Sequence, residues 1–220
     1  MEVKQSKRIQ TSILSGTEKK VLRWLALRQP SWMTSDMMTA IGVLGAIIIG
    51  AGYALTNYGI GFLWLSTLGY VINWYGDSLD GTLARVRNRQ RPIYGYYLDH
   101  TFDGINEVFM FIGAGLSPFF DLRVTMLALV FYLLLTVNVS MNAHLRSEFN
   151  LTYAGMGPTE FRIIMMILNT VMFCFGERMY DSIVPNALVI VITAVLGIIY
   201  LVTVFSDLRK YSKLDPMPKD

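Results

Sequence analysis

Residues 75–104 read YGDSLDGTLARVRNRQRPIYGYYLDHTFDG, two runs of acidic and small residues joined by an arginine-rich segment. Its aspartates, Asp77, Asp80, Asp99 and Asp103, stand in a chain otherwise rich in leucine, isoleucine and valine. A charged side chain inside a membrane helix costs at least about 2.5 kcal/mol. If the surrounding chain lies in a membrane, something must compensate this charge.

The composition favours a membrane protein. Of the 220 residues, 53% are hydrophobic and 16% charged, whereas about a quarter of the residues of a soluble domain are charged. A helical span needs about 20 apolar residues, and helices satisfy their own backbone hydrogen bonds in lipid. We therefore predict an all-α integral membrane fold with six transmembrane helices, at about 37–56, 61–84, 95–117, 122–145, 160–177 and 184–206.

The segment before the first span predicts an amphipathic juxtamembrane helix over residues 17–29, which contacts anionic lipid or packs on the bundle. Pro30 should end it, and Thr34 with its neighbours should cap the first span. We expect a cytoplasmic N-terminal segment at 1–36, a six-helix membrane domain at 37–206 and a cytoplasmic tail at 207–220.

The basic residues indicate the orientation. Lysine and arginine gather before residue 30, between the second and third spans, and in the tail, whereas the alternate links hold only Arg123 and Arg178. The positive-inside rule then puts both termini in the cytoplasm, which an even number of spans allows. In a bacterium this would be the inner membrane. We expect Arg87 to serve topology and to contact head groups, and we expect no nucleic-acid partner.

Two further features are interpreted as packing. Gly42 and Gly45 lie on nearly the same face of the first span, and small residues let membrane helices approach closely. Cys174 is the only cysteine, so an intrachain disulfide is excluded. We expect it to be a buried small side chain.

The aspartates lie in pairs on two helix faces. Asp77 and Asp80 share a face with Asn73, and Gly81 and Ala84 continue that stripe with small residues. On the next helix Gly95, Asp99 and Asp103 are spaced by four, and Glu107 lies one turn further along. The connection from Arg85 to Gly95 is short, so these helices should be antiparallel neighbours with the two pairs facing one another.

Four facing carboxylates repel one another and need a counter-charge. Arg85 is the arginine nearest to them in sequence, and one guanidinium cannot neutralise four acids. Carboxylate oxygens are the ligands that Mg²⁺, Mn²⁺ and Ca²⁺ prefer. The pattern therefore predicts a divalent metal site.

The full pattern is Asp77-x-x-Asp80-Gly81-x-x-Ala84-Arg85, nine residues, then Gly95-x-x-x-Asp99-x-x-x-Asp103. It resembles the signature of the CDP-alcohol phosphotransferases at all eight positions. The resemblance implies an enzyme of phospholipid biosynthesis that moves a substituted phosphate from a CDP-linked donor to an alcohol and releases CMP. It also implies a homodimer.

The resemblance implies roles for the motif residues. Asp77, Asp80, Asp99 and Asp103 would hold two ions, Mg²⁺ or Mn²⁺, about 4 Å apart. Asp103 would also be a candidate base for the alcohol proton. Gly81, Ala84, Arg85 and Gly95 would bind the CDP-linked substrate.

The donor and acceptor stay open. His100 follows Asp99 as in the choline and ethanolamine phosphotransferases, which would make His100 a second candidate base and diacylglycerol the acceptor. The segment GPTEFR, residues 157–162, also resembles that branch. Alternatively, CDP-diacylglycerol donates to a polar alcohol, and a phosphorylated acceptor would need basic residues such as His144, Arg146 and Arg162.

Two other classes also place acids in a membrane. A UbiA-like prenyltransferase uses aspartate-rich motifs with Mg²⁺, but its motifs usually lie on well-separated parts of a longer bundle. A cation transporter would carry acids near mid-bilayer, whereas these lie near the cytoplasmic side. Protection by cytidine nucleotides together with metal would distinguish the phosphotransferase from both.

Overall fold

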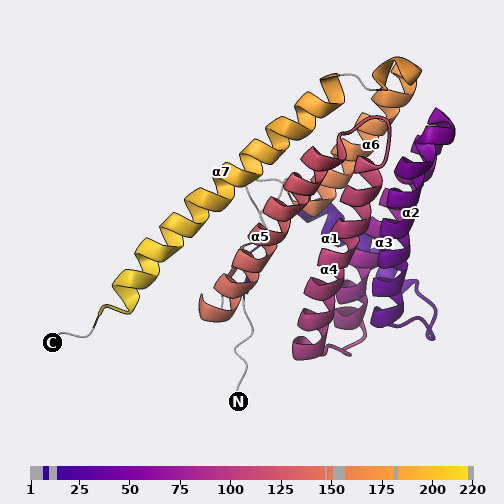
Figure 1. The fold of residues 1–220 in the computed structure, drawn as a ribbon. Coiled ribbons are helices and arrows are strands. Elements are labelled where there is room, and N and C mark those ends of the chain that lie inside the picture. The colour runs from indigo at the N-terminus through magenta and orange to yellow at the C-terminus, as the bar shows by residue number, and fades with distance from the viewer. Residues whose placement is uncertain (1–6, 10–13, 147, 151–156, 181–182, 218–220) are drawn as a thin grey trace.

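The computed structural model describes residues 7–9, 14–146, 148–150, 157–180 and 183–217, without the side chains of 7–9, 143–144, 146, 148–150 and 177. Figure 1 shows a helical bundle in which α7 lies beside α5, at the edge opposite α2 and α3. The helices are α1 (Ser15–Leu27), α2 (Ser35–Leu55), α3 (Leu63–Val86), α4 (Pro92–Gly115), α5 (Leu122–Arg146), α6 (Pro158–Phe175) and α7 (Ile183–Leu214). Short 3-10 turns are η1 (Thr56–Tyr58), η2 (Ile60–Phe62) and η3 (Gly176–Met179).

The six helices α2 to α7 coincide with the six predicted spans. Within the described part of the chain, α2, α5, α6 and α7 are long and apolar enough to cross a membrane. The remaining two, α3 and α4, which carry the aspartates, do not meet that criterion. The all-helical architecture is confirmed in outline, while the count of six spans stays a prediction.

The structure also has a short two-stranded sheet that the sequence did not predict. Strand β1 (Lys7–Ile9) pairs in parallel with β2 (Glu148–Asn150), and Arg8 is opposite Phe149. Both strands lie outside the predicted spans, in links whose backbone groups need partners that a helix does not supply. The pairing joins the N-terminal segment to the α5–α6 link.

The expected N-terminal helix is present as α1, and it packs on the bundle. Leu22 and Ala26 are buried against α2 and α3, while Trp24 and Leu27 are exposed. The exposed pair leaves an apolar surface for lipid. The predicted cap of the next helix is also present: the Thr34 hydroxyl accepts a hydrogen bond from the Met37 N–H at 3.2 Å.

Arg87 has partners within the protein that the sequence did not predict, while its expected role in topology stays a prediction. Its guanidinium donates hydrogen bonds to the carbonyl oxygens of Gln29, Pro30 and Met33, of which the first two are 3.0 and 2.7 Å long. These carbonyls belong to the turn between α1 and α2, whose oxygens no helix satisfies. These hydrogen bonds from Arg87 hold the α1–α2 turn against the C-terminal end of α3.

Close contact between α2 and α3 places the acidic face of α3. A Cβ atom added at Gly45 would overlap the backbone of Asn73, and one added at Gly76 would overlap the backbone of Gly42. The prediction that small residues allow close approach is thus confirmed. Asn73 uses this proximity and donates from Nδ2 to the Gly42 carbonyl at 2.9 Å. Both α3 and α4 pack chiefly against α2, and only weakly against each other.

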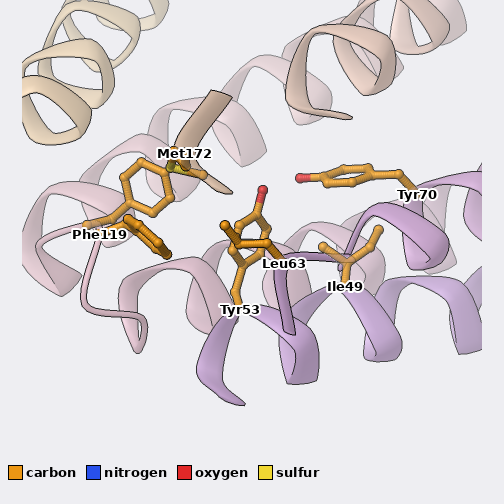
Figure 2. Packing of buried hydrophobic residues seen from close by; sticks show 7 residues of the cluster. Ile49, Tyr53, Leu63, Tyr70, Phe119 and Met172 are labelled. Carbon is orange, nitrogen blue, oxygen red and sulfur yellow. The ribbon is translucent and has the colours of Figure 1, made fainter. Parts of the chain in front are cut away.

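A buried cluster holds the bundle together at the ends of α2 and α4 away from the acids. Figure 2 shows Tyr53 between Phe119 and Tyr70. The Tyr53 and Tyr70 rings are edge-to-face, with centroids 6.5 Å apart. The Tyr53 hydroxyl donates to Asn169 Oδ1 at 2.7 Å, which satisfies a buried polar group and ties α2 to α6.

The outer face of α6 and most of α7 are apolar and exposed. Cys174 lies on this face of α6, so the expectation that it is buried is wrong. The reason is that α6 packs on the bundle through residues such as Asn169 and Met172, and Cys174 is turned away from them. Ile198 and Phe205 on α7 are likewise more than half exposed.

Candidate metal and substrate site

Three of the four motif aspartates converge. Asp77 from α3 and Asp99 and Asp103 from α4 each offer a carboxylate oxygen, and these oxygens all lie within 4.8 Å of one another. All three side chains are half-buried. The two helices meet here through their acids, as the sequence spacing indicated, although α2 supplies most of their packing.

Asp80 lies beside this group and has different partners. Its Oδ2 accepts a hydrogen bond from the Thr39 hydroxyl at 2.8 Å, and the Gly81 N–H donates to Oδ1. The Ser35 hydroxyl donates to the Asp80 carbonyl oxygen at 2.9 Å. Asp80 therefore joins α3 to the start of α2 and is not among the three convergent carboxylates.

Arg162 is the counter-charge that sequence reasoning did not place here. Its Nη2 lies 2.5 Å from Asp77 Oδ2, and its Nε donates to Asn73 Oδ1 at 2.8 Å. The side chain is 12% exposed. Because 85 positions separate Arg162 from Asp77, only the inference that α6 packs on α3 could have linked them. The side chains of His144 and Arg146, which were considered together with Arg162, lie outside the described residues.

The predicted substrate-binding positions leave open space. A Cβ atom added at Gly95 would meet nothing within 4 Å, and at Gly81 the nearest atom would be Arg85 Nη1 at 3.4 Å. Ala84 is half-buried. Arg85 is exposed and donates from Nη2 to the Thr82 hydroxyl at 2.9 Å. Helix packing therefore does not explain the small residues at 81 and 95.

His100 lies at the edge of the carboxylate group. Its Nδ1 is 3.0 Å from the Tyr96 carbonyl oxygen and 3.8 Å from Asp99 Oδ2, and its ring stacks on the Tyr96 ring with centroids 4.1 Å apart. A proton on Nδ1 would be donated to the carbonyl, which makes Nε2 the basic nitrogen.

Beyond Asp103, the same face of α4 carries two buried oxygens without a hydrogen-bond partner among the described residues, Asn106 Oδ1 and Glu107 Oε2. Buried oxygens of this kind are rare in folded proteins, so each needs a cause.

A cavity of about 270 Å³ lies between α2 and α4 next to this site. It is lined by Asp36, Thr39, Ala40, Val43, Leu98 and Phe102. Thr39 is also the partner of Asp80, so the cavity borders the motif. Its walls are mostly apolar.

The donor set fits a divalent cation. Three carboxylates converge, and Arg162 pairs with one of them, so negative charge remains in excess. Hard oxygen ligands of this kind suit Mg²⁺ or Mn²⁺. An arrangement of this sort can neutralise and orient phosphate groups, the main requirement of phosphoryl transfer.

One comparison with known proteins supports the motif. No protein-family model matches the chain. The phosphatidylinositol phosphate synthase of Cutibacterium acnes is 33% identical over 84 residues, which are 38% of this chain and 38% of that protein. The match thus spans well under half of the curated relative. It supports the family that the pattern of residues 77–103 indicates, the CDP-alcohol phosphotransferases.

Proposed function

We propose that this protein is a metal-dependent CDP-alcohol phosphotransferase of phospholipid biosynthesis, which transfers a substituted phosphate from a CDP-linked donor to an alcohol and releases CMP. The observation that carries the proposal is the convergence of Asp77, Asp99 and Asp103 within 4.8 Å. The partial relative, a phosphatidylinositol phosphate synthase, supports the same class of reaction.

In this proposal Asp77, Asp99 and Asp103 hold the ions, with Asp80 beside them. The bound cations supply charge neutralisation at the donor's pyrophosphate. Gly81 and Gly95 leave room for the nucleotide, because among the described residues nothing lies within 4 Å of a Cβ at Gly95, and only the end of the Arg85 side chain does so at Gly81. Arg85 lies at the rim, where its guanidinium can pair with phosphate oxygens.

Two groups are candidates to accept the alcohol proton. Asp103 lies within the carboxylate group, and His100 lies at its edge, 3.8 Å from Asp99. A histidine base suits a neutral alcohol near neutral pH. Substituting each residue in turn would distinguish them by the pH dependence of turnover.

Two donors are supported by different observations. The partial relative favours CDP-diacylglycerol with a polar acceptor, since its name specifies a phosphatidyl product. The Asp99–His100 pair in the sequence, which resembles that of the choline and ethanolamine phosphotransferases, favours CDP-choline or CDP-ethanolamine with diacylglycerol as acceptor. The proposal also includes a homodimer, six spans and a site open to the cytoplasm.

The test is CMP release by the purified protein in lipid nanodiscs, with Mg²⁺ or Mn²⁺. CDP-diacylglycerol, CDP-choline and CDP-ethanolamine are each paired with diacylglycerol, inositol phosphate, glycerol 3-phosphate or serine. We expect CMP from one donor class and only with metal. CMP from none of the pairs, together with no protection by cytidine nucleotides, would contradict the proposal and favour a transporter.

A further inference from the structure

Glu18 of α1 joins two helices of the candidate site. Its Oε1 accepts a hydrogen bond from Trp74 Nε1 at 3.0 Å and another from the Thr159 hydroxyl at 2.5 Å. Trp74 belongs to α3, and Thr159 belongs to the first turn of α6. One carboxylate oxygen therefore bridges the two helices that also meet through Asp77 and Arg162.

This bridge lies one helical turn from the ion pair of the site. Trp74 is three residues before Asp77 on α3, and Thr159 is three residues before Arg162 on α6. Residues three apart are neighbours on one side of a helix. The Glu18 bridge and the Arg162–Asp77 pair therefore cross the same contact between α3 and α6, and the bridge limits how far the pair can shift.

A second carboxylate fixes the start of α6 against the N-terminal segment. Glu160 is 9% exposed, and its Oε2 accepts a hydrogen bond from the Gly157 N–H at 3.0 Å. Its Oε1 accepts another from the N–H of Leu14, the residue before α1, at 2.9 Å. Each helix thus supplies one carboxylate to the other. A slide of α6 along α1 would break hydrogen bonds to both Glu18 and Glu160.

Trp74 is held by packing as well as by Glu18. Its side chain packs against the buried cluster that includes Leu22 and Ala26 of α1. Loss of the Glu18 carboxylate would remove the acceptor of the indole N–H while this apolar contact persists. At Thr159 the hydroxyl would lose its acceptor with no such contact to replace it. The start of α6 is therefore the part that Glu18 restrains most.

We propose that Glu18 is a positioning residue of the site: by bridging Trp74 and Thr159 it sets the start of α6 so that Arg162 reaches Asp77. This inference rests on the proposed function, since its effect is measured in CMP release. A misplacement of about 1 Å at a reacting centre can lower the rate about 100-fold. A shift of Arg162 would leave the Asp77 carboxylate free to turn away from the two carboxylates of α4.

The test is a double-mutant cycle on kcat for CMP release by the full chain in nanodiscs, with saturating metal and the donor and acceptor that react fastest. Glu18→Ala should lower kcat per folded molecule about tenfold. Glu18→Gln should stay within about threefold of the wild type, because its amide oxygen can accept both hydrogen bonds. In an Arg162→Lys background, Glu18→Ala should lower kcat less than about threefold, because Glu18 acts through Arg162.

The matched control is Gln29→Ala. Gln29 Nε2 donates to the Tyr75 hydroxyl at 2.7 Å, so this variant removes a hydrogen bond between the end of α1 and α3 without touching α6. It should lower kcat less than about threefold. Thermal unfolding gives the folded fraction of each variant. If Glu18→Ala does not fold, Thr159→Val takes its place in the cycle and should lower kcat about fivefold, because it removes one hydroxyl and keeps the side-chain shape.

The outcomes separate this inference from the proposed function. If Glu18→Ala lowered kcat equally in the wild-type and Arg162→Lys backgrounds, or not at all, Glu18 would not act through Arg162. An equal loss in Gln29→Ala would also overturn the inference, since general loosening of α1 would then be the cause. In these cases the wild type still releases CMP and the proposed function stands. A wild type that releases no CMP from any donor would overturn both.

Discussion

Asp99 is the cleanest single-residue probe of the carboxylate group. Its side chain is 37% exposed, against 21% for Asp77, so neutralising it should cost the fold less. Asp99→Asn should lower the rate of CMP release at least about 100-fold, which corresponds to about 2.7 kcal/mol of transition-state stabilisation. The measurement is CMP release under saturating metal, with thermal unfolding as the check on fold.

Asp77→Asn is a less clean variant, because it also removes the partner of Arg162. We expect it to lose both activity and stability, whereas Asp99→Asn loses activity alone. If Asp99→Asn released CMP at the wild-type rate, the carboxylates would not be acting as a metal site.

Gly95 gives a second prediction at the scale of one residue. A Cβ atom there meets no other atom within 4 Å, so Gly95→Ala should leave the melting temperature unchanged or slightly raised. If the space is reserved for the nucleotide, CMP should bind at least about tenfold more weakly, the effect of about 1.4 kcal/mol of steric conflict. Gly16→Ala, in equally open space on α1, is the control and should not alter CMP binding. Unchanged CMP affinity in Gly95→Ala would place the nucleotide elsewhere.

For single residues, the sequence predicted which aspartates lie together better than it predicted the residues that pair with them. Spacing along one helix puts Asp99 and Asp103 on one face, which periodicity alone reveals. Arg162 comes from another helix, and no local pattern connects it with Asp77. The spacing also puts Asp80 on the same helix face as Asp77. One of its carboxylate oxygens, however, accepts a hydrogen bond from the Thr39 hydroxyl of α2.

At the scale of elements, Arg87 should matter for stability and not for chemistry. It donates to the carbonyls of Gln29, Pro30 and Met33 in the α1–α2 turn. Arg87→Ala removes the guanidinium donors from these oxygens, of which the Pro30 oxygen keeps the Met33 N–H at 3.1 Å. It should destabilise the protein by about 1–3 kcal/mol, seen as a lower melting temperature. CMP release per folded molecule should fall less than threefold.

The matched control for this substitution is Arg89→Ala, since Arg89 is an exposed residue in the same link. It should leave the melting temperature unchanged. A normal melting temperature in Arg87→Ala would mean that water replaces the guanidinium at no cost.

The helices were the most predictable elements and the strands the least. Apolar runs fix α2 and α5 to α7 because each run is long enough to satisfy its own backbone in lipid. Pairing of β1 with β2 depends on two links far apart in sequence, and three-residue strands leave no periodicity to detect. Small residues on one face of α2 indicated that another helix would approach Gly45 closely. They did not indicate that this helix would be α3 or that the contact would be with Asn73.

At the scale of the whole molecule, the open question is whether α3 and α4 cross the membrane. Four other helices are apolar enough on their own, whereas α3 and α4 carry the acids. Both pack against α2, which is such a helix, and Arg162 and any bound cation would lower the cost of their charge. We therefore expect both to span.

Cysteine accessibility checks this topology directly. In a Cys174→Ser background, one residue at a time is replaced by cysteine. The positions are Tyr58 in the α2–α3 link, Asn88 in the α3–α4 link and Arg123 at the start of α5. An impermeant maleimide should label positions 58 and 123 in intact spheroplasts, and position 88 only after permeabilisation. Labelling of 58 and 88 from one side would mean that α3 does not cross, and labelling of 88 and 123 from one side would mean the same of α4. Labelling of all three positions from one side would make α3 and α4 a re-entrant pair of helices, in which water would offset more of the cost of the carboxylate charges than Arg162 does.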